Sequence, residues 1–424
     1  MGSGRSKEAR GPARGIAVEI NLRRALGWAV ILVIMALLPA AADSGQPAQA
    51  PPDESLAAKQ RPLFEKLHVL EAWQLTKGSP DVLVGVIDNG FDFFHPDLVG
   101  QLTPGYYAPG GYHTEIAESV GHGTLVASII AAKGEEAVGM TGLAPGCRII
   151  TASLGMIDHK LLRLELEFLK AHPDAKLADF QSVMAAHGKE LQAFGEAWTT
   201  YQATSAAGAV RYLVDHGVRV INHSGYLQKG LIASPDAWRE LDDAFRYAAS
   251  KDVLIVLSAG NLAQESNDYP GDESHTIVAG ASMLNDERWE EEDNIMGTMI
   301  KQGSNYGKRL TVMAPTESIL VCVPHEQRFY AADNSPMGAR QNEFAGMHEF
   351  QRQGATSSAA PIVTSLVALV YSLRPDLRAE SVIEIIKQGC DDIGAAGYDT
   401  YTGYGRVNFL RTLELARDFQ QPTQ

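Results

Sequence analysis

The chain has 424 residues, of which 45% are hydrophobic, so it can bury the core of one large α/β domain or of two average domains. Its formal net charge is −15 at pH 7, and no cluster of Lys and Arg forms a basic face. Because phosphate backbones are bound by such faces, this composition excludes nucleic acid as the main partner. Three cysteines, Cys147, Cys322 and Cys390, are too few for a disulfide scaffold. One disulfide and one thiol could form, but we expect all three to be core residues.

The first 42 residues have the pattern of a targeting segment. A stretch with net charge +4 over residues 1–24 precedes an apolar run over residues 26–38 and a group of small residues. This order predicts a secretory signal peptide and therefore export to the periplasm or the extracellular space. The alternative is a retained N-terminal anchor, because residues 25–42 approach the length of a membrane span, and only then would the protein contact a membrane. Residues 43–62, rich in Ala, Gln and Pro, are predicted to form a flexible linker.

Strand and helix patterns alternate from residue 63 onward, which predicts a mostly parallel sheet with helices on both faces. We therefore expect one three-layer α/β domain over residues 63–418. Residues 158–197, charged and helical in pattern, and residues 325–353, polar and irregular, are expected to be insertions. Strands are expected at 82–87, 148–154, 218–225, 253–261, 276–281 and 310–315, helices at 67–73, 121–132, 207–216, 236–250, 357–370 and 379–388, and an acidic loop at 286–293.

A serine lies where one of these apolar helices begins. Ser357 follows the small residues Gly354 and Ala355, so it would occupy a helix N-terminus, where free backbone N–H groups and a partial positive charge can hold an oxyanion. The alternative is a helix cap that packs tightly on a neighbouring element. A serine hydroxyl attacks well only when a base takes its proton and a carboxylate orients that base. A nucleophilic Ser357 therefore requires a suitably placed His and Asp.

The chain offers one candidate for each of these two roles. Asp88 ends the strand expected at residues 82–87, where working residues gather in open parallel sheets; the alternative is an Asp-Asn-Gly turn. His122 lies between Gly121 and Gly123 at the start of an expected helix. This arrangement predicts a rigidly held ring with space for a substrate beside it, although such a histidine on its own is more often structural.

An asparagine at the end of another strand completes the candidate site. Asn261 follows Gly260 after the strand expected at residues 253–261. Its side-chain amide could donate to the same oxyanion as the Ser357 N–H, an interaction typically worth about 3 kcal/mol of transition-state stabilisation. The alternative is an asparagine in a left-handed turn after glycine.

Five motifs together resemble those of the subtilisin-like serine proteases, the subtilases, and occur in the order of that family over roughly residues 63–415. They are Val86-Ile87-Asp88-Asn89-Gly90, His95-Pro96-Asp97-Leu98, Gly121-His122-Gly123-Thr124, Ser258-Ala259-Gly260-Asn261 and Thr356-Ser357-Ser358-Ala359-Ala360-Pro361. The resemblance implies a subtilisin-like fold and an exported serine endopeptidase. Ser357 would be the nucleophile, His122 the general base, Asp88 its orienting carboxylate and Asn261 the oxyanion-hole donor.

The same resemblance implies how a polypeptide substrate binds. An extended peptide would pair with the backbone around Ser224 and Gly225, and we place Gly260 in the same substrate-binding set. No cofactor is required. Calcium is common in the family and Asp97 matches a frequent ligand position, but Glu135 or Glu136 in the adjoining loop is no clear replacement for the other ligands, so calcium is kept as an alternative and no metal site is assigned. We expect a monomer.

Some positions depart from the pattern of the family. Ala355 and Ser358 stand where Gly and Met are usual, Asn89 replaces Thr or Ser, and Tyr226 could partly fill the first specificity pocket. These departures motivate an alternative, a catalytically inactive relative that binds peptides. A Rossmann-like nucleotide-binding domain is disfavoured because no glycine-rich fingerprint follows the first strand.

Overall fold

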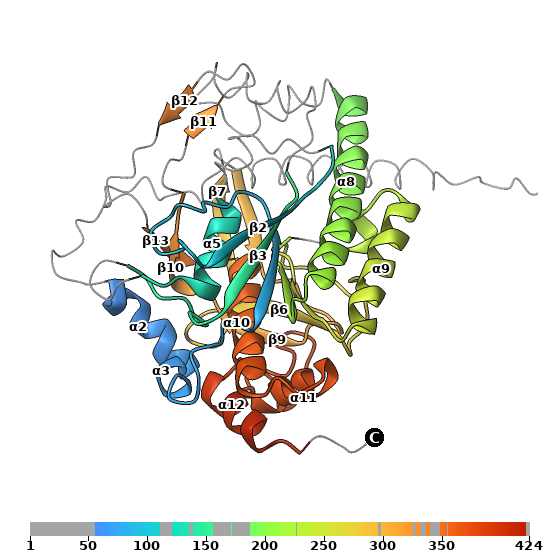
Figure 1. Ribbon diagram of the computed structural model, residues 1–424. Coiled ribbons are helices and arrows are strands. Elements are labelled where there is room, and N and C mark those ends of the chain that lie inside the picture. Colours follow the sequence, from blue (N-terminus) through green and yellow to red (C-terminus); the bar gives the residue numbers. More distant parts are fainter. Residues whose placement is uncertain are drawn as a thin grey trace, which may run out of the picture.

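The computed structural model describes residues 56–110, 121–134, 139–155, 171, 187–225, 227–295, 298–324, 328–330, 336–339, 348–353 and 355–420. Within these residues, seven strands form a sheet in the order β2-β3-β1-β4-β5-β6-β9, and every neighbouring pair is parallel (Figure 1). The strands are β1 Leu83–Asp88, β2 Leu102–Tyr107, β3 Arg148–Ser153, β4 Val220–His223, β5 Leu254–Ser258, β6 Thr276–Ser282 and β9 Val312–Pro315.

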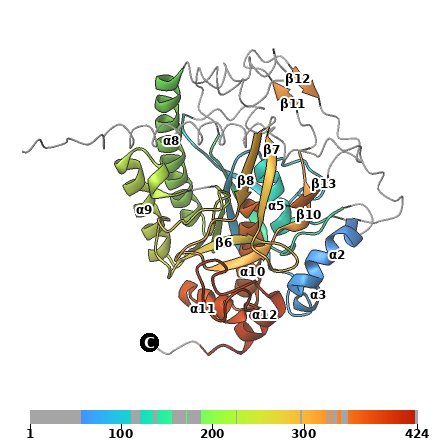
Figure 2. The ribbon, with the colours of Figure 1, turned by 180° about the vertical axis from the view of Figure 1, so that it is seen from behind.

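Helices cover both faces of this sheet (Figures 1 and 2). On β5, Leu254 and Val256 belong to the core shared with α5 and α10, whereas Ile255 and Leu257 belong to the core shared with α8 and α9. This alternation follows from the two-residue period of a strand that is buried on both faces. The expected three-layer α/β fold is therefore confirmed. The helices are α2 Leu56–Leu67, α3 Val69–Ala72, α5 His122–Ala131, α8 Gly188–Asp215, α9 Pro235–Ser250, α10 Thr356–Leu373, α11 Ala379–Gly389, α12 Phe409–Asp418 and the 3₁₀ turn η1 Lys229–Leu231.

Helix α10 runs through the core. Among the described helices it is the one long and apolar enough to cross a membrane, yet 83% of that stretch is buried inside the fold, as in a core helix. Its first turn carries Ser357, so the most firmly packed helix of the domain positions the candidate nucleophile. The predicted signal or anchor segment, residues 1–42, lies outside the described residues.

The structure differs from the expected linker at its C-terminal part. Residues 56–62, expected to be flexible, form the first half of α2, and residues 43–55 lie outside the described part of the chain. The helix is stabilised by packing, because Leu63, Phe64 and Leu67 in its second half are buried in the core. The sequence signal was weak because Pro62 interrupts the helical pattern.

Three antiparallel pairs lie outside the main sheet. They are β7 Glu290–Ile295 with β8 Thr298–Gly303, β10 Glu317–Cys322 with β13 His348–Gln353, and β11 Arg328–Tyr330 with β12 Pro336–Ala339. The acidic loop expected at 286–293 is thus partly a strand, and the segment 325–353 contains three short strands. These strands were missed because sequences such as Glu-Glu-Glu-Asp-Asn-Ile lack the apolar alternation by which strands are recognised.

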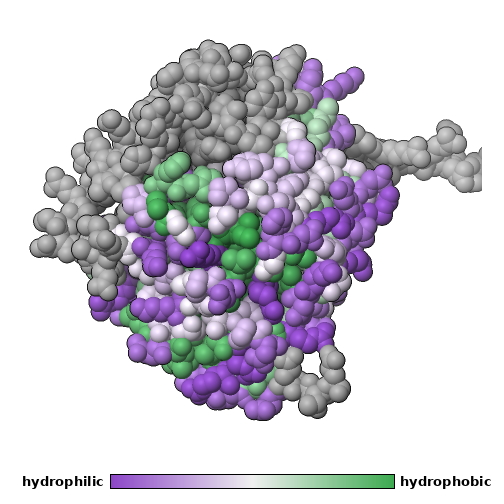
Figure 3. Space-filling model, viewed as in Figure 1, coloured by the Kyte–Doolittle hydropathy of each residue, from purple (hydrophilic) through white to green (hydrophobic). Residues whose placement is uncertain are grey.

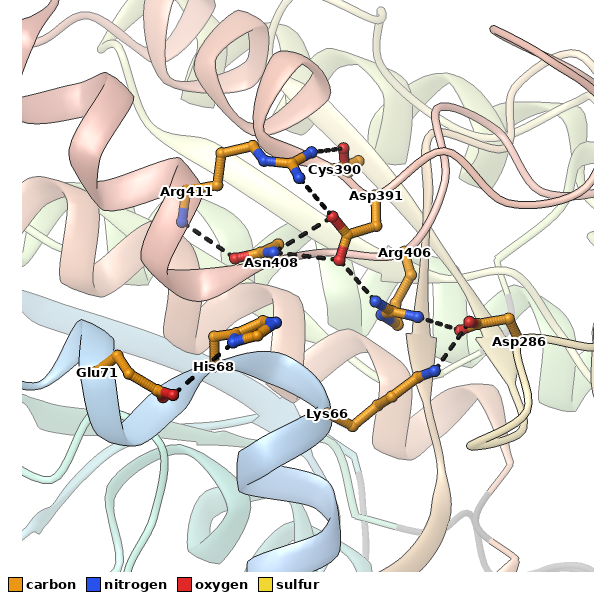
Figure 4. A network of polar contacts seen from close by, with 9 residues as sticks. All are labelled: Lys66, His68, Glu71, Asp286, Cys390, Asp391, Arg406, Asn408 and Arg411. Carbon is orange, nitrogen blue, oxygen red and sulfur yellow. Dashed lines mark hydrogen bonds and ion pairs between the residues drawn. The ribbon is translucent and has the colours of Figure 1, made fainter.

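A chain of ion pairs joins the two ends of the domain (Figure 4). Lys66 on α2 bonds to Asp286 with Nζ–Oδ2 2.8 Å, and Asp286 also pairs with Arg406. Arg406 Nη2 lies 2.6 Å from Asp391 Oδ2, and Arg411 on α12 reaches the other oxygen of Asp391 at 2.9 Å. The N-terminal helix is therefore linked to the C-terminal segment through alternating charges.

The three cysteines are all free and buried. They therefore lie in the core, as expected. Burial, followed by the charge of Asp97, raises the pKa of Cys322 well above its ordinary value, so this thiol stays protonated at neutral pH.

Candidate active site

The structure places Asp88 and His122 in direct contact. Asp88 ends β1 and His122 begins α5, and His122 Nδ1 lies 2.7 Å from Asp88 Oδ1 and 2.9 Å from Oδ2. The Asp88 side chain is 7% exposed and the imidazole 36%. Because a carboxylate accepts hydrogen bonds, this contact assigns the proton to Nδ1 and leaves Nε2 as the ring nitrogen that carries the lone pair. The Asn89 N–H holds Asp88 Oδ1 from the other side at 2.7 Å.

Two histidines near this carboxylate have opposite pKa shifts. Burial alone would lower the pKa of His122, but the charge and hydrogen bond of Asp88 outweigh burial and raise the pKa above its ordinary value. Burial lowers the pKa of His223, which pairs with Ile87 across the sheet, so its ring stays neutral. The sequence analysis did not single out His223. Its position near the end of the strand expected at residues 218–225 was the available signal.

The glycines that flank His122 serve close packing. Gly121 is the N-cap of α5 with φ +66°, and a Cβ built there would lie 2.3 Å from the Pro324 ring. A Cβ on Gly123 would lie 2.8 Å from the Phe91 ring. Pro324 and Phe91 therefore hold the start of α5 against its neighbours, and the space for a substrate beside the His122 ring stays a prediction.

The Asn261 side chain is anchored to the residue before Ser357. Asn261 Oδ1 accepts from the Thr356 N–H at 3.0 Å and from Thr356 Oγ1 at 2.6 Å, and Thr356 Oγ1 in turn accepts from the Gly260 N–H at 3.1 Å. With Oδ1 occupied, the Asn261 NH₂ group is the free end of the amide. Within the described residues, neither this NH₂ group nor the Ser357 N–H has a hydrogen-bond partner.

A proline in α10 connects Ser224 to Ser357. Pro361 has no N–H, so the helix provides no donor for the Ser357 carbonyl four residues earlier. Ser224 Oγ donates to that carbonyl at 2.9 Å, and Asn222 Nδ2 donates to Ser224 Oγ at 2.9 Å. Thr364, also on α10, holds Asn222 through a 3.0 Å bond. The segment after β4 is thus fixed against the first turn of α10.

Gly225 uses both of its backbone polar groups inside the protein. Its N–H donates to His223 Nδ1 at 2.9 Å, and its carbonyl accepts from Ser258 Oγ at 3.1 Å. A Cβ on Gly225 would lie 2.2 Å from the His223 ring, so the glycine makes room for that ring. Tyr226, expected to shape a specificity pocket, lies outside the described residues.

The candidate residues gather at one edge of the sheet. The strands β1, β4 and β5 are neighbours in the sheet; β1 ends at Asp88, β4 is followed by Ser224, and β5 is followed after two residues by Asn261. The helices α5 and α10, which carry His122 and Ser357, pack on the same face of this sheet. In the part of the chain described, no hydrogen bond joins His122 to Ser357. Such contacts are often long until a substrate is bound.

The fold defined by these elements is that of subtilisin-like proteins. The crystal structure of fervidolysin, a keratinolytic enzyme related to subtilisin, matches it with a TM-score of 0.55 at 25% identity and covers 85% of this chain and 46% of that one. The Subtilase family model matches residues 79–405, and the chain belongs to this family. The family and the fold expected from the five motifs are therefore confirmed.

Curated relatives are about a quarter identical to the chain over the residues that match. Fervidolysin from Fervidobacterium pennivorans is 28% identical over 367 residues, covering 84% of this chain and 43% of that protein. A thermophilic serine proteinase from a Bacillus species is 27% identical over 341 residues (80% and 63%). A calcium-dependent protease from Trichormus variabilis is 24% identical over 369 residues (82% and 48%). The chain thus spans about half the length of these relatives.

Proposed function

We propose that this chain is an exported serine endopeptidase that hydrolyses peptide bonds through Asp88, His122 and Ser357. The observation that carries the proposal is the short contact between His122 Nδ1 and Asp88 in a chain of the subtilase family, at the sheet edge where Ser357 begins α10. Relatives named as serine proteases support the reaction class.

The proposed reaction assigns one step to each side chain. His122 Nε2 takes the proton of Ser357 Oγ as the oxygen attacks the peptide carbonyl carbon. Asp88 keeps the proton on Nδ1 and stabilises the imidazolium that forms. His122 then gives its proton to the leaving amine, the acyl-enzyme remains, and water attacks it by the same route in reverse. No cofactor is required for these steps.

Two donors are proposed to hold the oxyanion of the tetrahedral intermediate. They are the Asn261 NH₂ group and the Ser357 N–H, both without another partner in the described part of the chain. The positive end of α10 adds to their effect, since Ser357 is the second residue of that helix. The bonds from Thr356 support this assignment because they fix the amide with NH₂ as its free end.

Ser224, Gly225 and Gly260 are proposed to line the substrate cleft. Since Gly225 uses its own N–H and carbonyl internally, it contributes shape there, and the substrate backbone would pair with the residues on either side of it. The proposed partner is an extended polypeptide bound to a monomer, and export follows from the N-terminal segment. The protein would stay membrane-anchored if that segment were retained.

An active-site label tests this proposal against the inactive, peptide-binding alternative. A fluorophosphonate reacts with a serine only when a base activates it, so the folded chain should be labelled on the peptide that contains Ser357. Ser357→Ala should remove the label and His122→Ala should slow labelling by on the order of 10³ or more. A folded wild-type chain that remains unlabelled would favour the inactive relative.

A further inference from the structure

Asp97 matches a position that often binds calcium in the family, and the groups around it decide whether calcium can bind in this chain. The Asp97 residue is 5% exposed, and its Oδ2 accepts from the Met140 N–H at 2.9 Å. The Cys322 thiol on β10 donates to the same oxygen at a longer S–O distance of 3.9 Å. On the other side, a Cβ added to Gly139 would lie 2.6 Å from Asp97 Oδ1. Backbone and thiol groups therefore enclose the carboxylate closely.

Nearby carbonyl groups, the other usual ligands of calcium, also accept hydrogen bonds. The Asp97 carbonyl accepts from the Lys133 N–H at 2.8 Å, and the Met140 carbonyl accepts from the Gly134 N–H at 2.9 Å. The Ala132 carbonyl accepts from the Gly142 N–H at 2.8 Å. Calcium needs six to eight oxygen ligands, as a rule, arranged around a cavity that can hold the ion. Here these oxygens point at N–H groups of the same loop.

The N-terminal helix completes this closure. The Gln60 side chain on α2 donates from Nε2 to the Thr141 carbonyl at 2.8 Å and accepts from the Thr141 N–H through Oε1 at 3.0 Å. Gln60 is buried, so this paired bond is shielded from water. Both polar backbone groups of Thr141, the residue after Met140, are thereby fixed to α2.

The side chains around Asp97 are also poorly matched to calcium. Ligand atoms of His95, Asp97 and Cys322 lie within 4.8 Å of one another, and all three residues are buried. Calcium prefers oxygen alone, whereas this set includes nitrogen and sulfur. His95 Nδ1 accepts from the Asp97 N–H at 3.1 Å and the thiol donates to Asp97, so these groups already act as hydrogen-bond partners.

We infer that this chain closes the calcium position at Asp97 with hydrogen-bond donors of its own, and that the surrounding fold is held there without a cation. The relative from Trichormus variabilis is named a calcium-dependent protease, and this chain would differ from it in needing no calcium at Asp97. Glu135 and Glu136, the acidic residues of the adjoining loop, lie outside the described residues. The inference concerns stability and does not depend on the proposed catalytic reaction.

Thermal unfolding with calcium and with EGTA tests this inference in the full chain. The shift in Tm on adding calcium should be the same, within about 1 °C, for the wild type and for Asp97→Asn. Calcium at a hundred times its Kd for a site at Asp97 would raise the Tm of the wild type by about 3–4 °C, and the variant would lose that gain. Asp376→Asn, an exposed carboxylate paired with Arg374, is the control for the change of charge.

A rise in Tm on adding calcium that is present in the wild type and absent in Asp97→Asn would overturn the inference. An equal shift in both chains would support it, whatever its size, because a site elsewhere would not require Asp97. If Asp97→Asn does not fold, wild-type crystals soaked in terbium chloride decide the question. Anomalous density bonded to Asp97 would overturn the inference, and a structure with the Met140 bond intact and no ion at Asp97 would support it.

Discussion

The orientation of the Asn261 amide depends on Thr356, which donates to Asn261 Oδ1 twice. Thr356→Val removes the hydroxyl and keeps the shape, so the amide is held by the backbone bond alone. We expect kcat to fall about tenfold with KM nearly unchanged, because the lost interaction supports the oxyanion rather than the substrate. Steady-state kinetics on a peptide substrate measure this split.

Two further variants control that experiment. Thr356→Ser restores the hydroxyl and should recover most of the activity, whereas Asn261→Ala removes the donor itself and should cost about 10²–10³ in kcat. A Thr356→Val enzyme with wild-type kcat would show that the threonine does not orient the amide.

The pKa of His122 sets the acid limb of the expected pH profile. Asp88 holds this pKa above the ordinary value of 6.5, so kcat/KM should rise with pH through a midpoint above 6.5 as the imidazole loses its proton. The raised pKa also affects stability. The protonated His122–Asp88 pair stabilises the fold at pH values below the pKa of His122 in the unfolded chain, and this stabilisation is lost as pH rises through its pKa in the folded chain. In Asp88→Asn the charge of Asp88 is absent and burial lowers the pKa of His122, so the acid limb of kcat/KM should move to lower pH. A limb unchanged by that variant would contradict the pairing.

The candidate residues were predictable to different degrees. Asp88 and His122 stood out because each lies at a recognisable end of a strand or helix, and the structure joins them. The contact between Asn261 and Thr356 spans 95 positions in the chain, and no local pattern encodes it. The packing of Gly123 against the Phe91 ring was not predicted, because only the fold brings these two residues together.

At the scale of elements, the first turn of α10 depends on a side chain from another strand. Pro361 leaves the Ser357 carbonyl without its helical donor, and Ser224 Oγ takes that place. Ser224→Ala would leave this partly buried carbonyl without its donor, so we expect a loss of about 1–2 kcal/mol in the free energy of unfolding. Urea denaturation measures it.

Ser365 on the same helix provides the matched control. Its hydroxyl donates to the Pro361 carbonyl at 2.7 Å, but that carbonyl also has the helical N–H of Ser365 within reach. Ser365→Ala should therefore cost less, under about 1 kcal/mol. If Ser224→Ala and Ser365→Ala lost the same free energy of unfolding, the missing N–H of Pro361 would not be the reason that the Ser224 bond matters.

The strands of the main sheet were predicted well for a physical reason. β1, β5 and β6 are buried on both faces, so each is an unbroken apolar run that sequence reveals. The edge strand β2, Leu-Thr-Pro-Gly-Tyr-Tyr, was missed because Pro104 and Gly105 interrupt it, which only an edge position tolerates. The polar strand β7 gave no periodic signal.

At the scale of the whole molecule, Arg406 holds the ends of the domain together. Its side chain is 9% exposed between Asp286 and Asp391, and Lys66 extends the chain of charges to α2 (Figure 4). Arg406→Ala would leave two carboxylates without their buried partner, so we expect a loss of about 3 kcal/mol in the free energy of unfolding. Lys66→Ala removes a more exposed pair and should cost under about 1 kcal/mol.

Acid unfolding checks the same network. Burial would raise the pKa of Asp286, but Arg406 and Lys66 outweigh it and hold the pKa below the ordinary value of 3.8. The stabilisation is therefore present above that value and is lost as pH falls through the folded pKa. Arg406→Ala should lose this part of the pH dependence. A variant as stable as the wild type at neutral pH would contradict the network.

The exterior of the described part of the chain is mostly hydrophilic on one face. On the face shown in Figure 3, hydrophilic residues cover most of the described surface, and apolar residues gather in smaller patches between them. Phe94, which is 86% exposed, belongs to the loop that follows Asp88, and Asp92 of that loop is bonded to Thr124 in the first turn of α5. An apolar ring thus lies exposed on a loop attached to the helix of His122.

Hydrolysis of casein by the chain from Asp43 onward, beside its Ser357→Ala variant and across pH, tests the central claim most directly. The account predicts that the wild type cleaves casein with a rate that rises through the titration of His122, and that the variant loses on the order of 10⁴ or more of that rate while staying folded. A folded, monodisperse wild type without hydrolysis, or a variant with the wild-type rate, would contradict it.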